Sequence, residues 1–213
     1  MSKTHRAVLN FFAVILGVVT LVGSWVFHDP SLARLSFLDP VLNSGPSIPQ
    51  EWEIHLSSKY NLALRYPPGY AVDPSYVYTQ IGDKSGMRGI KFSIPETITS
   101  GTNLSADSGV SIEVLPKGLP CSGSEFVYQG LAIDSLTDQG VDYSVVKTAQ
   151  SAAGNLYEEI VYVIKESKPC TAVRYFFHST QLANYPSGEV RQFDKRALLK
   201  DFDTVRRSLS LTR

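Results

Sequence analysis

The chain has 213 residues, of which 43% are hydrophobic and 19% are charged, and these proportions exclude a largely disordered protein. Its 20 Lys and Arg residues balance its 20 Asp and Glu residues, and no basic cluster is longer than Lys195–Arg196 or Arg206–Arg207. Because binding to a nucleic-acid backbone needs a concentrated positive surface, this charge pattern argues against a nucleic-acid-binding protein.

The N-terminus is predicted to anchor the protein in a membrane. Residues 1–6 carry Lys3 and Arg6, and residues 7–27 (AVLNFFAVILGVVTLVGSWVF) contain no charged residue. A helix of this length, at ~1.5 Å per residue, spans a hydrocarbon core of ~30 Å, and the preceding positive charges favour a cytoplasmic N-terminus. We therefore expect a short cytoplasmic segment followed by an uncleaved transmembrane signal anchor. A cleaved signal peptide is the alternative, and both place residues 28 onward outside the cytoplasm.

The region after the anchor changes from a linker to a domain. Residues 28–50 contain four prolines and predict an extended extracytoplasmic linker. From residue 51 onward, apolar and polar residues repeatedly alternate, which is the period of a half-buried strand. The alternating stretches are YNLALRY (60–66), GIKFSIP (89–95), GVSIEVLP (109–116), YSVVKTA (143–149), LYEEIVYVI (156–164) and TAVRYFFHS (171–179).

A polar segment at 102–108 leads into the strand at 109–116. Its clustered oxygens could bind a cation or a carbohydrate, but a calcium loop needs more carboxylates than the single Asp107. Asn, Ser and Asp side chains also hydrogen-bond their own backbone and shape turns. We interpret the segment as an ordered entry loop, with Asn103 and Asp107 as candidate binding residues at its edge.

Two segments have the pattern of helices. Residues 124–139 begin with a Ser that can cap a helix, contain spaced apolar residues and stop before Gly140. Residues 193–211 have Asp194 as a cap and a single apolar stripe formed by Leu198, Phe202, Val205 and Leu209. The predicted fold class is α+β: a mainly antiparallel sheet of about six strands with two packed helices, preceded by one N-terminal transmembrane helix.

The two cysteines, Cys121 and Cys170, are predicted to form a disulfide. Neither has the spacing of a metal site, and the four histidines are dispersed, so we expect no metal site. Two buried free thiols are the alternative, but export to an oxidising compartment favours pairing. On the chain-entropy model such a bond would stabilise the fold by ~4 kcal/mol.

No stretch of the sequence has the pattern of a catalytic site. Ser144 and Lys147 have the S-x-x-K spacing of penicillin-binding enzymes, but that motif needs a helix and this segment is a predicted strand. Glu158 and Glu159 are neighbours on a predicted strand, so their carboxylates face opposite ways and form no acid–base pair. We interpret His178, near a strand end, as a structural histidine.

Four tyrosines are candidates for a binding surface: Tyr66, Tyr70, Tyr76 and Tyr78. Tyrosine is enriched at interfaces because it combines a large apolar body with a polar tip. Packing along alternating strands is the other explanation. With Asn103 and Asp107, these tyrosines make up the predicted binding surface.

The stretch YNLALRYPPGY, followed by an antiparallel sheet and a closing helix, resembles the PsbP-like fold of the extrinsic P subunit of photosystem II. Domains of that fold open with aromatic-x-hydrophobic-x-Tyr-Pro-x-Gly-aromatic, which is matched by Leu64, Tyr66, Pro67, Gly69 and Tyr70. The resemblance implies that residues 51–213 form a PsbP-like α+β domain. Because the photosynthetic members are binding and assembly subunits, it also implies a protein-binding role.

A second likeness is to uncharacterised bacterial membrane-anchored or exported proteins, and it covers most of residues 60–211. It rests on the segments IPETITSGTNLSADSGVSIEVLP, GVDYSV, AAGNLYEE and CTAVRYFFH and on the C-terminal helix. The likeness brings no known activity. It supports a location at the bacterial inner membrane, with the C-terminal domain in the periplasm or the extracellular space.

The chain is therefore predicted to be a membrane-tethered extracytoplasmic binding or assembly module without catalytic activity or a cofactor. Its expected partners are the lipid bilayer, through the N-terminal helix, and an envelope protein. The alternative is a cell-envelope hydrolase or another enzyme whose site assembles only in three dimensions. A deep pocket joining His178 or His55 to a Ser and a carboxylate would favour the enzyme, and a flat aromatic patch around Tyr70 to Tyr78 would favour the binding module.

Overall fold

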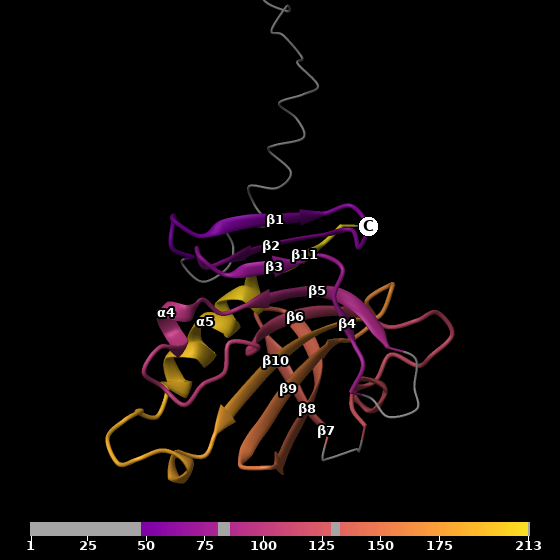
Figure 1. Ribbon diagram of the computed structural model, residues 1–213. Coiled ribbons are helices and arrows are strands. Elements are labelled where there is room, and N and C mark those ends of the chain that lie inside the picture. The colour runs from indigo at the N-terminus through magenta and orange to yellow at the C-terminus, as the bar shows by residue number, and fades with distance from the viewer. Residues whose placement is uncertain (1–47, 81–85, 129–132, 213) are drawn as a thin grey trace, which may run out of the picture. The chain divides into compact units, whose positions relative to one another are not determined.

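The computed structural model describes residues 48–80, 86–128 and 133–212 (Figure 1). The predicted cytoplasmic segment (1–6), the predicted anchor (7–27) and nearly all of the predicted linker lie outside the described residues. Among the helices that are described, none has both the length and the apolar character needed to cross a bilayer.

Eleven strands are found in the described part of the chain. They are β1 (Glu53–Ser57), β2 (Leu62–Tyr66), β3 (Ala71–Asp73), β4 (Val77–Tyr78), β5 (Met87–Ser93), β6 (Gly109–Val114), β7 (Ile133–Asp138), β8 (Val141–Ala152), β9 (Asn155–Ile164), β10 (Thr171–Thr180) and β11 (Ser210–Leu211). The α-helices are α4 (Glu96–Thr99) and α5 (Lys195–Ser208), and the 3₁₀ turns are η1 (Gly123–Phe126) and η2 (Leu182–Asn184).

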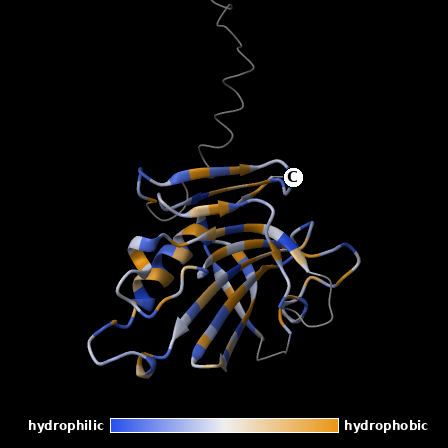
Figure 2. Ribbon diagram, in the orientation of Figure 1, coloured by the Kyte–Doolittle hydropathy of each residue, from blue (hydrophilic) through white to orange (hydrophobic). Residues whose placement is uncertain are grey.

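The strands form two sheets, and every pairing between these named strands is antiparallel. The main sheet has the order β3-β5-β6-β10-β9-β8-β7, with β4 also paired to β5, and the small sheet has the order β1-β2-β11. Figure 2 shows hydrophobic and hydrophilic residues alternating along the long strands of the main sheet, as the period-two pattern predicts. The six predicted strands correspond to β2, β5, β6, β8, β9 and β10.

This architecture corrects the predicted α+β fold class, because the fold is mostly antiparallel β-structure in two sheets and α5 is the one long helix among the described residues. The described residues of the segment 124–139 do not form the predicted helix: they contain part of η1 and then β7, which pairs with β8. The reason is the turn that follows. Gln139 and Gly140 both have positive φ (52° and 78°), which is the geometry of a two-residue hairpin turn. Gly140 therefore closes a hairpin rather than ending a helix.

Helix α5 confirms the second helix prediction. It begins after Asp194, whose Oδ1 accepts a hydrogen bond from the Ala197 backbone N–H at 3.0 Å. Its apolar stripe packs on the main sheet, where Phe202 lies 5.5 Å from the ring of Tyr175 and 5.3 Å from that of Phe177. Burying an aromatic side chain of this kind contributes about 1.5–3 kcal/mol. The larger core therefore lies between α5, the small sheet and one face of the main sheet.

A second, smaller core lies on the opposite face of the main sheet. There Phe126 of η1 packs with Val146, Val161 and Val163 of the central strands, and all four side chains are buried. The segment that carries η1 is tied to the beginning of β10 by the disulfide between Cys121 and Cys170, which confirms the predicted pairing. The covalent bond thus holds a loop as a cover over this core.

Replacing both cysteines by Ser is expected to lower the free energy of unfolding by about 2–4 kcal/mol, because the unfolded chain regains the freedom of a loop whose ends are 49 residues apart. Denaturant unfolding of the purified full-length protein, followed by circular dichroism, measures the change. Wild-type protein treated with a reductant is the control and should unfold like the double variant. A double variant as stable as the oxidised wild type would contradict the prediction.

Candidate binding face

The two faces of the main sheet carry different chemistry. Along β10, Tyr175 and Phe177 face α5, so alternation directs Arg174, Phe176 and His178 to the other side. We call this side the outer face. Register then assigns more residues to it, because cross-strand partners share a face: Glu159 and Tyr157 on β9, Ser111 on β6 and Lys91 on β5.

The centre of the outer face is a buried ion cluster around Arg174, whose side chain is 0% exposed. Its Nε and Nη2 donate to the two oxygens of Glu113 at 2.8 and 2.9 Å. Its Nη1 donates to Glu159 at 2.7 Å, and Nη2 also donates to the backbone carbonyl of Phe126 at 2.6 Å. The guanidinium lies 3.6 Å from the centre of the Tyr78 ring. One cation thus joins three adjacent strands and the loop that covers them.

The two carboxylates accept further hydrogen bonds. The hydroxyl of Tyr78 donates to Glu159 at 2.6 Å, and the hydroxyl of Ser111 donates to Glu113 at 2.7 Å. A longer bond of 3.4 Å runs from Thr148 to Glu159. Every charged group of the cluster therefore has partners, which is the condition for burying charge in a protein interior.

The pKa values of Arg174 and Tyr78 are displaced away from neutrality. Burial alone lowers the pKa of Arg174, but Glu113 and Glu159 outweigh burial and raise the pKa of the guanidinium above its usual value. Burial raises the pKa of Tyr78, Arg174 opposes this effect, and Glu159 raises the pKa further. Neither group changes its protonation near pH 7, so neither is suited to exchange a proton with a ligand.

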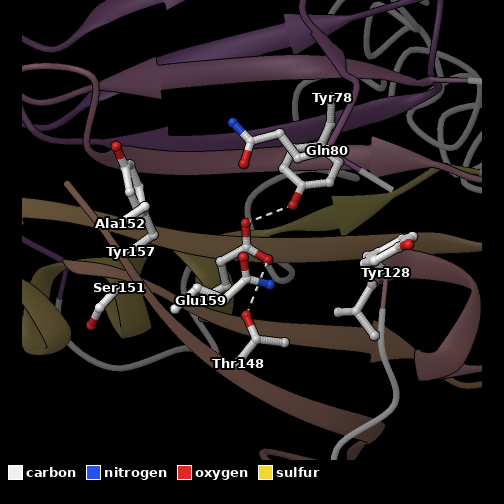
Figure 3. A pocket seen from close by; sticks show the side chains of 10 residues that line it. Tyr78, Gln80, Tyr128, Thr148, Ser151, Ala152, Tyr157 and Glu159 are labelled. Carbon is white, nitrogen blue, oxygen red and sulfur yellow. Dashed lines mark hydrogen bonds between the residues drawn. The ribbon is translucent and has the colours of Figure 1, made fainter. Parts of the chain in front are cut away.

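A pocket of about 470 Å³ opens beside the cluster (Figure 3). Glu159 lies at its base, where Figure 3 shows the Tyr78 hydroxyl and Thr148 directed toward the carboxylate. The side chains around it are mostly neutral: the tyrosines Tyr78, Tyr128 and Tyr157, the amides Gln80 and Gln150, the hydroxyls Thr148 and Ser151, and the apolar Val127 and Ala152. Aromatic walls with a few polar groups are typical of a ligand site.

A smaller pocket of about 190 Å³ adjoins the first, because Tyr78 and Gln80 line both. It brings together Tyr76, Tyr78 and Asp107, three of the six predicted binding residues. Lys91 reaches into the same region, with its ammonium 5.4 Å from the centre of the Tyr76 ring. Tyr76, Tyr78 and Asp107 therefore lie together, and their role as a binding surface stays a prediction.

An aromatic row joins the two pockets. Phe176 lies under Lys91, at 5.4 Å from ring centre to ammonium, and stacks at 6.5 Å on Tyr157. Tyr157 in turn stacks on His178 at 4.4 Å. Sequence reasoning missed Lys91, Phe176 and Tyr157 as neighbours, although their alternation in the strands was visible. Only the register of β5, β6, β9 and β10 brings them side by side.

The other three predicted binding residues line neither of these two pockets, and they are as buried as Tyr78, which is 6% exposed. Tyr66 and Tyr70 are each 7% exposed and belong to the larger core, and the hydroxyl of Tyr66 donates to Glu53 at 2.8 Å. Asn103 is 8% exposed and ties two segments, since its Nδ2 donates to the carbonyl of Thr180 at 2.8 Å. Its Oδ1 accepts from the backbone N–H of Phe193 at 3.0 Å. In Tyr66 and Asn103 these contacts occupy the polar groups that a ligand would need.

Neither of the described histidines, His55 and His178, assembles a nucleophilic triad with other described residues. His178 Nδ1 lies 2.9 Å from Asp107, but the other nitrogen, Nε2, lies 3.2 Å from Asn155 Oδ1. The nearby hydroxyl of Ser108 instead accepts from the backbone N–H of His178 at 3.0 Å. His55 packs edge-on against Phe92 at 5.5 Å, and burial lowers its pKa. In neither case does a hydroxyl nucleophile meet the imidazole among these contacts.

Glu158 and Glu159 face opposite sides of the sheet, as predicted. Glu158 accepts from Lys195 of α5 at 2.6 Å, whereas Glu159 belongs to the cluster on the outer face. No group of three or more His, Cys, Asp or Glu side chains positioned to hold a metal is found among the described residues.

Substituting Arg174 by Met is expected to destabilise the protein by about 3–5 kcal/mol, because it leaves two carboxylates buried without their cation. Denaturant unfolding of the full-length protein gives the value. Arg196→Met, at an exposed position on α5, is the matched control and should change stability by no more than about 0.5 kcal/mol. Adding Glu113→Gln and Glu159→Gln should restore part of the loss. Equal effects of Arg174→Met and Arg196→Met would exclude a structural role for the cluster.

The comparisons with known proteins concern the fold. No family model matches the chain, and no curated protein matches it significantly. Among solved structures, it is similar to cyanobacterial PsbP (CyanoP) from Synechocystis sp. PCC 6803, with 15% identity, a TM-score of 0.43 and coverage of 79% of this chain and 96% of that chain. It is also similar to a protein from Bacteroides thetaiotaomicron VPI-5482, with 10% identity, a TM-score of 0.46 and coverage of 77% of this chain. The chain spans 50% of the length of the Bacteroides protein. Both likenesses are at low identity and concern the fold alone.

Proposed function

We propose that the chain is a non-catalytic binding or assembly module that acts outside the cytoplasm and is tethered to the bacterial inner membrane by residues 7–27. The uncharged apolar run and the preceding Lys3 and Arg6 support the tether. The disulfide between Cys121 and Cys170 supports an oxidising compartment, since such bonds persist there and are rare in the cytosol.

The observation that carries the proposal is the pocket on the outer face. Its acidic group, Glu159, accepts hydrogen bonds from Arg174, Tyr78 and Thr148, which hold the carboxylate in place. The surrounding tyrosines offer ring surface to a ligand. This combination supports recognition rather than chemistry at the site.

The charge of the pocket favours a cationic group as its ligand. Among the described residues that line it, Glu159 is charged and none is Lys, Arg or His. Glu159 shares the single cation of Arg174 with Glu113, which does not line the pocket, and the three groups together carry one excess negative formal charge. A cation placed over tyrosine rings gains about 0.5–2 kcal/mol. A basic side chain of an envelope protein has this chemistry, and such a protein is the partner that we propose.

The pocket is tested with tetramethylammonium as the probe and the full-length protein in a neutral detergent. We expect weak, saturable binding by calorimetry. Tyr128→Ala and Tyr157→Ala should each weaken it about fivefold, which corresponds to the loss of about 1 kcal/mol of cation–π attraction. Tyr185→Ala is the matched control, because Tyr185 lies after η2 and outside the pocket.

Acetate serves as the probe of opposite charge and should not bind at this pocket. Binding of acetate that Tyr157→Ala abolishes would contradict a cation site, and so would tetramethylammonium binding that none of the pocket variants changes. Either result would leave the tether hypothesis to be judged separately.

The tether makes its own prediction. The intact chain should sediment with membranes and resist extraction at alkaline pH, because a span of residues 7–27 buries about 30 Å of helix in hydrocarbon. A variant lacking residues 7–27 should not associate with membranes. Protease added to spheroplasts should digest the domain at 51–213, and release of the intact chain by alkali or full protection from protease would refute the proposed topology.

A further inference from the structure

The domain has a second hollow, whose lining residues differ in chemical character from those of the pocket on the outer face. It is a groove of about 900 Å³ and shares no lining residue with the pocket on the outer face. The turn between β1 and β2 forms one wall through Lys59, Tyr60 and Asn61. Strands β4, β5 and β6 and the segment after β6 form the rest.

All the charged residues that line the groove, among those the structure describes, are cations: Lys59, Arg88 and Lys117. Each is exposed. None of the three forms an ion pair with another described residue. The ammonium of Lys59 lies 4.9 Å from the centre of the Tyr60 ring. In a chain whose formal net charge is zero, this is a local excess of positive charge without an acidic partner in the described part of the chain.

The floor of the groove is apolar. It includes Val77, Val114, Leu115, Pro116 and Pro169. Val77 is 44% exposed although it is part of a strand, so a large apolar surface stays open beside the cations. An occupant that fits must therefore carry both apolar and anionic groups.

Two features, one of the backbone and one of a side chain, favour a peptide over a lipid as that occupant. Among the described strands, β4 pairs only with β5, so its other edge offers unpaired backbone groups to an extended chain. The hydroxyl of Tyr60, in the groove wall, is buried and has no hydrogen-bond partner in the described part of the chain. A buried hydroxyl of this kind is stabilised by a polar group that it can bond.

We propose that this groove docks an extended acidic segment of a partner protein. The carboxylates of the segment meet Lys59, Arg88 and Lys117, and an apolar side chain between them covers Val77 and Leu115. This inference goes beyond the cation pocket and does not depend on it, because the two sites have no residue in common.

The test uses the full-length chain in its native membrane with a photoreactive benzoylphenylalanine at Leu119, an exposed residue next to the groove. After irradiation, mass spectrometry identifies the crosslinked peptide itself. We expect an adduct with a protein segment that contains several Asp or Glu residues. The double variant Arg88→Glu/Lys117→Glu should lower the yield at least tenfold.

The matched control is Lys147→Glu/Arg196→Glu, which changes the net charge by the same amount at exposed positions outside the groove. It should leave the yield unchanged, as should Tyr157→Ala in the cation pocket. Equal melting curves of all variants establish that they fold. Lys substitutions of the acidic residues in the captured segment should restore the adduct with the charge-reversed groove.

Four results would overturn the proposal: no adduct, an adduct with lipid, an adduct with a segment that lacks acidic residues, or equal loss in the control variant. An adduct with lipid would assign the groove to the membrane surface instead. Failure of the tetramethylammonium experiment would not affect any of these outcomes, so the two sites are judged independently.

Discussion

The structure depends on the burial of one guanidinium between two carboxylates. Arg174, Glu113 and Glu159 lie on three adjacent strands, and separating any of them from the others would leave a charge in the protein interior. A slip of one residue in either pairing would move the partner to the opposite face of the sheet. The cluster thus defines the register of β6, β10 and β9, whereas apolar side chains alone would tolerate several arrangements. The same requirement brings Phe126 and Tyr78 over the sheet, because the cluster uses the carbonyl of one and the hydroxyl of the other.

The candidate pocket is a consequence of this arrangement. The covering segments contribute Tyr78, Gln80 and Tyr128 to its walls, and the sheet contributes Tyr157 and Glu159. The carboxylate of Glu159, which accepts hydrogen bonds from Arg174, Tyr78 and Thr148, is held in position, and this suits the recognition of a fixed shape. The polar groups of the ion cluster on the outer face are therefore already bonded within the protein, and a ligand can contact the remaining surfaces of the aromatic rings.

Much of the fold could be predicted from local patterns, and the exceptions have physical reasons. Six strands followed from period-two alternation, and α5 followed from its apolar stripe and Asp194, because each signal lies within one element. The prediction of a helix at 124–139 was wrong, because sparse apolar residues followed by a Gly are compatible with the end of a helix and also with a hairpin. Only the pairing partner β8, which lies beyond that Gly, distinguishes them.

In the site, Tyr76 and Asp107 proved accessible, whereas Tyr66, Tyr70 and Asn103 are buried. Alternation assigns residues to a face but does not say what covers that face. Arg174 and Glu113 were visible as charged residues within apolar strands. Their pairing could not be predicted, because it depends on the register between two strands and the sequence of one strand does not give that register.

The small sheet has a consequence for the order in which the protein is made. Strand β2 is completed by β11, and the hydroxyl of Ser208 at the end of α5 bonds the backbone N–H of Arg65 at 2.8 Å, across 143 residues of sequence. A chain emerging from the ribosome therefore presents β1 and β2 long before it can present the elements that cover them. During that interval the apolar side chains of Leu62 and Leu64 lack their native surroundings. Folding of the larger core therefore waits for α5 and β11, and until they have been synthesised the nascent chain remains open to the factors that handle unfolded polypeptides.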